Sequence, residues 1–209
     1  MHIGIHRLVG RDDQPHRHAV RIDRVAGERP GEKDVVMKRR LLAALLDYCV
    51  MLSWLAVLAA LFVPLYLAGF AVWDDHPDLV AFVASVVPVW LYLTATESSA
   101  AGATWGKRRA GLRVLGPQGK RAHPARIAAR NAVKLMPWQL AHLGVVALLS
   151  SPGAATMVSP ANAWLPISAT YAMVALTVTL MFVRDDHTAL HDLIAGTRIL
   201  ATEPVPHTI

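Results

Sequence analysis

The residue that most clearly invites chemistry is Asp47, a carboxylate inside the apolar stretch 41–63. An ionised carboxylate within a bilayer costs about 2.5–3.5 kcal/mol on insertion scales unless another group pairs with it. Arg40 lies nearly two helical turns earlier, on the same helical face and about 10 Å away, so the two mark one charged stripe without forming a direct ion pair. Both are candidates for a charged network or an ion relay, because protons and cations compete for carboxylate oxygens.

Arg130 is a candidate partner for Asp47. It stands four residues after Arg126, so the two arginines share a helix face at a membrane surface. They either anchor lipid headgroups or pair with a carboxylate such as Asp47 or Asp192. We expect Asp47 to face the protein interior, within reach of Arg130 or Arg198, because lipid exposure would leave its charge unpaired.

A second polar segment contains His187 and His191, whose spacing places two imidazoles on one helical face beside Asp192. Two histidines and a carboxylate could hold a metal. A third well-placed ligand is missing, so no metal site is assigned. The candidate network is therefore Arg40, Asp47, Asp192 and Arg130, with secondary candidates Lys107, Arg113, His191 and Arg198.

Gly106 and Lys107 look at first like part of a phosphate-binding loop. The spacing excludes that motif, because Arg108 stands where Ser or Thr should bind magnesium and position 101 is Ala. Without a nucleophile elbow, zinc signature or cofactor fingerprint, we expect neither an enzyme nor a cofactor. The isoelectric point near 9.9 would suit nucleic acid, but no nucleic-acid-binding fingerprint accompanies the arginines, so nucleic acid is not an expected partner.

The elements that must position these residues are long apolar helices. The chain is 54% hydrophobic and 17% charged, whereas a soluble domain usually carries about 25% charged residues. Windows 55–61 and 173–183 show almost no polar face, which argues against buried helices of a soluble bundle. Four stretches come near the roughly 20 residues that a bilayer core requires: 41–63, 79–96, 132–150 and 164–183.

The charge distribution predicts the orientation of these spans. Of the 21 Lys and Arg, ten lie in residues 1–40 and eight in 97–131, whereas 73–78 and 151–163 contain none. By the positive-inside rule, both termini and the 97–131 connection are cytoplasmic. The same basic segments favour anionic lipid headgroups. We therefore expect a multi-pass membrane protein.

Short elements are expected on the cytoplasmic surface. Leu112 to Leu115 and Arg198 to Ala201 read as strands, and a turn at 116–119 invites Lys120 to Ala122 to return as a third. Because an isolated hairpin is marginally stable, we predict that the C-terminal strand pairs with 112–115. That pairing would hold a short interfacial helix, which carries Asp192 and ends near Ala195, under the bundle.

The expected fold is thus an all-α membrane protein: a four-helix transmembrane bundle with a small cytoplasmic β-sheet and an interfacial C-terminal helix. Residues 1–37 read as a disordered basic cytoplasmic tail, 38–202 as the transmembrane domain and 203–209 as a C-terminal tail. Residues 1–36 lack the apolar stretch of a cleavable signal peptide. Cys49 is the single cysteine, which excludes an intrachain disulfide.

Three separated motifs resemble the RDD family of bacterial integral membrane proteins, named for one arginine and two aspartates. The resemblance covers roughly residues 38–202 and rests on Arg40 to Asp47, on Thr104 to Lys107 with Gly111 to Val114, and on Leu190 to Thr197. It implies that Arg40, Asp47 and Asp192 are the name-giving residues. Trp105 departs from the pattern, because the family more often has a leucine-like residue there.

The resemblance implies a bacterial plasma-membrane location but no defined activity, although some members are implicated in cation/proton exchange. We favour a structural or accessory membrane component, whose charged network specifies one arrangement of helices. The alternative is cation or proton transport with Asp47 as the exchange carboxylate. Four short spans leave little room for two gates, so transport would call for a homodimer or another membrane protein as partner.

Overall fold

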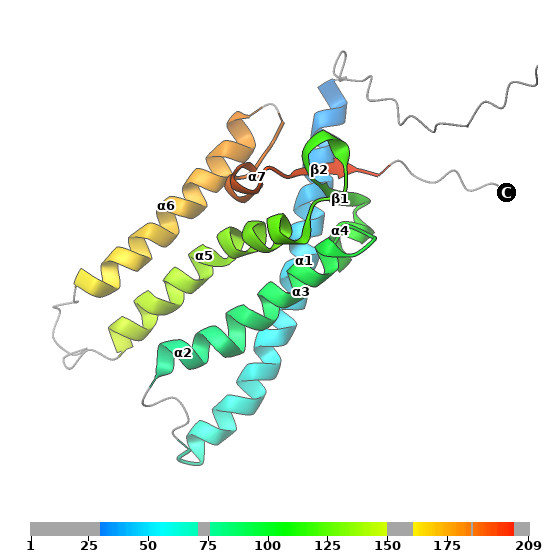
Figure 1. Ribbon diagram of the computed structural model, residues 1–209. Coiled ribbons are helices and arrows are strands. Elements are labelled where there is room, and N and C mark those ends of the chain that lie inside the picture. Colours follow the sequence, from blue (N-terminus) through cyan, green and yellow to red (C-terminus); the bar gives the residue numbers. More distant parts are fainter. Residues whose placement is uncertain (1–29, 71–75, 150–160, 185, 203–209) are drawn as a thin grey trace, which may run out of the picture.

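The computed structural model describes residues 30–70, 76–149, 161–184 and 186–202 (Figure 1). This described part of the chain is mostly helical, with two short strands. The elements follow in the order α1 (Pro30–Leu67), α2 (Pro77–Ala81), the π-helical turn η1 (Phe82–Val86), α3 (Val87–Ser98), α4 (Trp105–Arg109), β1 (Leu112–Leu115), the 3-10 turn η2 (Pro117–Gly119), α5 (Pro124–Leu149), α6 (Ala161–Val183), α7 (Leu190–Ala195) and β2 (Arg198–Ala201).

Among the described residues, three helical stretches are long and apolar enough to cross a membrane: Val36–Leu67, Pro77–Ser98 and Ala163–Val183. Their outer faces carry exposed Leu, Val, Phe and Tyr side chains, as expected where lipid replaces water. The expected span 132–150 falls on α5, which is not among the three. Polar residues interrupt the apolar run of α5: Asn131, Lys134, Gln139 and His142.

The first helix begins earlier than the sequence suggested. We assigned residues 1–37 to a disordered tail, but α1 starts at Pro30, so that boundary was wrong for residues 30–37. Proline is well tolerated in the first turn of a helix, where its missing N–H has no intrahelical partner. The assignments of residues 1–29 and 203–209 to tails lie outside the described residues.

The helices α6, α5 and α3 lie side by side, whereas α1 packs mainly on shorter elements of the chain. The helix α6 packs along α5, and α3 packs on the other side of α5 (Figure 1). Helix α1 packs mainly on α4, on η1 and on β1. A small apolar core joins the two parts and consists of Met51, Val86, Val89, Leu93 and Leu135.

A proline creates one of the links between α1 and the second span. Pro88 has no N–H, so the carbonyl of Ala84 one turn earlier loses its helical donor. The indole Nε1 of Trp54 in α1 donates to that carbonyl at 3.0 Å. The π-helical turn at Phe82–Val86 thus lies where the helical hydrogen bonding is interrupted. Trp54 of α1 supplies the missing donor.

The predicted strand pairing is confirmed. Strands β1 and β2 are antiparallel, with Leu112 opposite Ala201 and Leu115 opposite Arg198. The expected third strand is reduced to one bridge between Leu115 and Arg121. Helix α7 ends at Gly196, whose left-handed backbone (φ 61°) turns the chain into β2. The sheet therefore fixes α7 beside the start of α5.

Candidate functional site

Asp47 is buried, as expected, but its partners are different from those we expected. Its Oδ2 accepts a hydrogen bond from the Thr104 hydroxyl at 2.6 Å, and its Oδ1 accepts one from the Gly106 N–H at 3.0 Å. Both donors belong to the start of α4, where Thr104 is also the N-cap and binds the Lys107 N–H. The expected partners Arg130 and Arg198 were wrong, and the carboxylate fastens α1 to α4.

Gly106 allows this close approach. A Cβ at this position would lie 2.5 Å from the Ala43 carbonyl oxygen and 2.7 Å from Asp47 Oδ1. Real Cβ atoms do not approach other atoms so closely, and the first of these contacts is with backbone of α1. Glycine at this position is therefore what brings the N–H of α4 onto the carboxylate.

Glu97 is the centre of a second set of contacts that the sequence analysis missed. Its Oε1 accepts from the Lys107 ammonium, and its Oε2 accepts from Arg130 Nη1 at 2.8 Å and from the Asn131 amide at 3.2 Å. The Glu97 side chain is fully buried. One carboxylate thus joins the end of α3 to α4 and to the start of α5.

Arg130 continues the chain of charges to α7. Its Nε donates to Asp192 Oδ1 at 2.6 Å, and the same oxygen accepts from the Thr197 hydroxyl at 3.0 Å. Arg130 is 1% exposed, so its two ion pairs are shielded from solvent. We call the set Glu97, Lys107, Arg130 and Asp192 the charged network.

The protonation states in α7 agree with this pairing. Burial alone would raise the pKa of Asp192, but Arg130 outweighs burial and lowers it below its usual value. Burial lowers the pKa of His191 to about 3, and the positive charge of Arg130 acts in the same direction. His191 is therefore neutral at physiological pH although its Nε2 lies 3.6 Å from Asp192 Oδ2. Arg130 is the cation that balances Asp192.

Two further arginines bind the backbone of the C-terminal segment. Arg40 donates to the His187 carbonyl at 2.5 Å and to the Ile199 carbonyl at 2.9 Å. Arg126 donates to the Ala195 carbonyl at 3.1 Å. Arg40 therefore holds the segments before and after α7, and it does so through carbonyl oxygens rather than through Asp47.

The structure brings most of the predicted site residues to one end of the molecule. Five of them meet there: Arg40, Lys107, Arg130, His191 and Asp192. By contrast, Arg113 and Arg198 are exposed on β1 and β2. Glu97 could have been found by the argument applied to Asp47, since it ends an apolar span. Thr104 and Asn131 carried no comparable signal, because neutral polar residues are common in connections and at helix ends.

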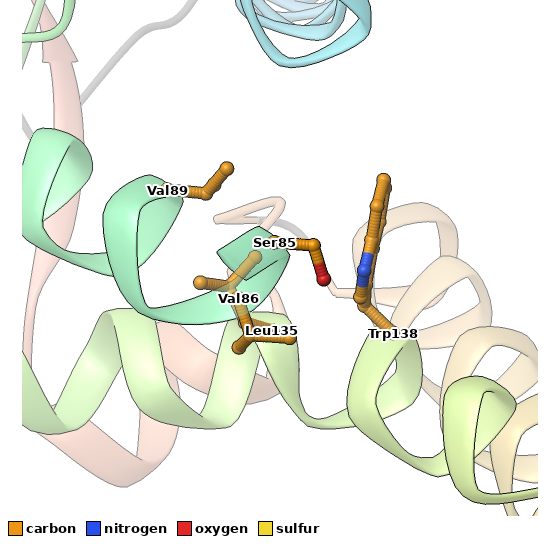
Figure 2. A pocket seen from close by; sticks show the side chains of 5 residues that line it. All are labelled: Ser85, Val86, Val89, Leu135 and Trp138. Carbon is orange, nitrogen blue, oxygen red and sulfur yellow. The ribbon is translucent and has the colours of Figure 1, made fainter. Parts of the chain in front are cut away.

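A small cavity lies away from this network, between η1, α3 and α5. It is lined by Ser85, Val86, Val89, Leu135 and Trp138 (Figure 2). It has no room for a water molecule. The Ser85 hydroxyl is engaged with the Ala81 carbonyl at 2.6 Å. This cavity is therefore a packing defect of the apolar core and not a ligand site.

Comparison with known proteins agrees with the motifs. The model of the RDD family matches residues 35–196, which include Arg40, Asp47 and the whole charged network. No curated protein and no solved structure matches the chain significantly. The family match covers more than half of the chain, and the chain therefore belongs to the RDD family.

Proposed function

We propose that this chain is a structural or accessory component of the bacterial plasma membrane, and that the charged network acts as a clamp. The observation that carries the proposal is that Glu97 and Asp192 of the network, and Asp47 beside it, all accept hydrogen bonds from the protein itself. Both oxygens of Asp47 and of Glu97 accept hydrogen bonds from protein donors, and Asp192 is held by Arg130 and Thr197. The partners of these carboxylates are therefore groups of the protein itself, and a transported cation is not needed to balance them. Nor do they present a nucleophile, so we propose no catalytic role.

Networks of this kind can specify one arrangement of helices even when they add little net stability. Here the clamp joins segments that are distant in sequence: the end of α3, the start of α4, the start of α5 and α7. Its partners in the membrane would be lipids and either a second copy or another membrane protein, for which the clamp provides a fixed surface.

We also propose four spans with both termini cytoplasmic. Arg40, near the start of the first candidate span Val36–Leu67, contacts His187 and Ile199, which follow α6. The two ends of the domain therefore lie on the same side, which calls for an even number of crossings. Three spans are evident by composition. An α5 that crosses beside α6 supplies the fourth, and the basic residues at the clamp end favour the cytoplasmic side.

This topology predicts which positions an impermeant thiol reagent reaches in intact cells. In a Cys49→Ser background, Asp78→Cys should be labelled, because Asp78 is exposed in the first turn of the second span, at its outer end. Lys120→Cys lies in the 3-10 turn region after β1 and should be labelled only after the cells are opened. Labelling of Lys120→Cys in intact cells would overturn the proposed orientation, and labelling of both positions would exclude four spans.

The second candidate function is cation or proton transport, which is favoured by the position of Asp47 and Glu97 within apolar helices. Reconstituted proteoliposomes with a sodium or potassium gradient and an internal pH dye separate the two functions. The clamp predicts that wild-type vesicles change their internal pH no faster than empty vesicles. A cation-dependent flux that disappears in Asp47→Asn would refute the clamp as the sole role.

A further inference from the structure

The short helix α4 directs three large side chains outward. Trp105, Arg108 and Arg109 are exposed, whereas Gly106 and Lys107 between them are buried against the protein. Residues three and four apart lie on the same side of a helix, so the exposed side chains form one surface, which we call the α4 face. The guanidinium of Arg109 lies over the Trp105 ring, 5.3 Å from its centroid. The clamp uses the opposite side of α4 and leaves the α4 face without a role.

The two arginines of the α4 face have donors available for an anion. Arg108 donates from Nε to the Ala103 carbonyl at 3.1 Å, and its terminal nitrogens are not used in that contact. Among the described residues, no carboxylate forms an ion pair with Arg108 or with Arg109. A guanidinium can bind a phosphate through two parallel hydrogen bonds, and its stacking on an aromatic ring leaves those donors at its edge accessible.

The α4 face lies beside two of the candidate spans (Figure 1). The backbone N–H of Trp105 donates to the Tyr92 hydroxyl at 3.4 Å, and Tyr92 is six residues inside the end of the span Pro77–Ser98. The next N–H, that of Gly106, donates to Asp47 in the first span. Trp105 is therefore held at the level of residues that belong to both spans, and not in a connection that extends away from them.

The length of α1 indicates the depth of this level in the bilayer. Leu67 ends both α1 and the first candidate span. Counted back from Leu67 at about 1.5 Å per residue, a hydrocarbon core of roughly 30 Å ends near Asp47. Trp105 is thus level with the edge of the core, where the lipid headgroups begin. It is 44% exposed, so no described segment covers it. Tryptophan is enriched at this depth, and arginine there extends its charge toward the headgroups.

We propose that the α4 face binds the headgroup of an anionic phospholipid in the leaflet at the clamp end of the protein. Arg108 and Arg109 bind the lipid phosphate, and the Trp105 ring lies against the glycerol region. Zwitterionic phosphatidylcholine fits less well, because its choline cation is repelled by the two arginines. General attraction of basic segments to the membrane surface would not depend on these three side chains. The site requires only the first two spans and goes beyond the clamp.

Native mass spectrometry of the full chain in detergent, titrated with phosphatidylglycerol or with phosphatidylcholine, tests the lipid preference. The wild type should bind the first phosphatidylglycerol at least about tenfold more tightly than phosphatidylcholine, as expected for hydrogen bonds between charged groups. Arg109→Met should lose most of that preference. Arg113→Met is the matched control, because it removes the same charge from the exposed side of β1 and should behave as the wild type. An equal preference in both variants would show that total surface charge attracts the lipid.

Fluorescence quenching tests the depth of Trp105 in vesicles of phosphatidylcholine and phosphatidylglycerol. The emission lost in Trp105→Leu, relative to the wild type, isolates the contribution of this residue. Lipids brominated close to the headgroup should quench that emission more strongly than lipids brominated at the chain ends, and more strongly than aqueous iodide. Stronger quenching by iodide would place Trp105 in water and contradict the site.

Three other outcomes would also overturn the proposal. Competition by millimolar inorganic phosphate would assign the site to a soluble anion. Loss of a dimer in Arg109→Met would mean that a second copy covers the α4 face. If Arg109→Met fails to fold, the wild type alone decides, because absence of a phosphatidylglycerol preference contradicts the site. The clamp is tested separately by unfolding, so the two proposals can fail independently.

Discussion

Replacing Arg130 with methionine should lower the free energy of unfolding by about 3–5 kcal/mol, because it leaves two buried carboxylates without their cation. Arg130 is 1% exposed and binds both Glu97 and Asp192, so water is not available to replace it. Methionine has a similar length and a high helix propensity, so the loss reports the missing charge rather than a broken α5. The measurement is reversible unfolding of the purified protein in mixed micelles.

Arg113→Met is the matched control for this prediction. Arg113 is exposed on β1, and a surface substitution of this kind should change the free energy of unfolding by less than about 0.5 kcal/mol. Equal, small effects of the two substitutions would mean that the network around Arg130 does not hold the fold together.

Gly106→Ala should destabilise the protein by about 2–4 kcal/mol, through overpacking and the loss of a buried hydrogen bond to a charged group. The sign of this change in the free energy of unfolding is informative. In an exposed helix interior, alanine is more favourable than glycine by roughly 0.5–1 kcal/mol. Here its methyl group would meet the Ala43 carbonyl and Asp47, so α4 would have to move away from α1. Thermal unfolding in detergent measures the change.

Gly119→Ala is a suitable comparison, because open space surrounds that position and only its left-handed backbone (φ 71°) opposes a side chain. We expect it to cost about 1 kcal/mol. If Gly106→Ala were neutral or stabilising, the contact between α4 and Asp47 would not be as close as the structure has it.

Much of the architecture around β1, β2 and α7 could be predicted from the sequence. The strands at Leu112–Leu115 and Arg198–Ala201 follow glycines and consist of strand-forming residues, and their pairing was the simplest way to stabilise both. Burial of Asp47 followed from the expense of exposing a carboxylate to lipid. For Arg130 the sequence left open lipid headgroups, Asp47 and Asp192 as partners, and the structure has Arg130 paired with Asp192.

The partners of Asp47 could not be predicted from residue types. One of its donors is a backbone N–H, which every residue except proline possesses, and what matters at Gly106 is the absence of a side chain. From residue types alone, a charged side chain is expected to bind a side chain of opposite charge. Arg40 instead binds two carbonyl oxygens, and such partners depend on how distant segments pack.

The clamp is tested most directly by a double-mutant cycle between Glu97 and Arg130, measured as free energies of unfolding in mixed micelles. The cycle combines Glu97→Gln, Arg130→Met and the double variant. If the two residues act as one unit, the double variant should be about 2 kcal/mol more stable than the sum of the single effects predicts, since contacting charged residues couple by roughly 0.5–3 kcal/mol. Additive effects, within about 0.5 kcal/mol, would contradict the clamp.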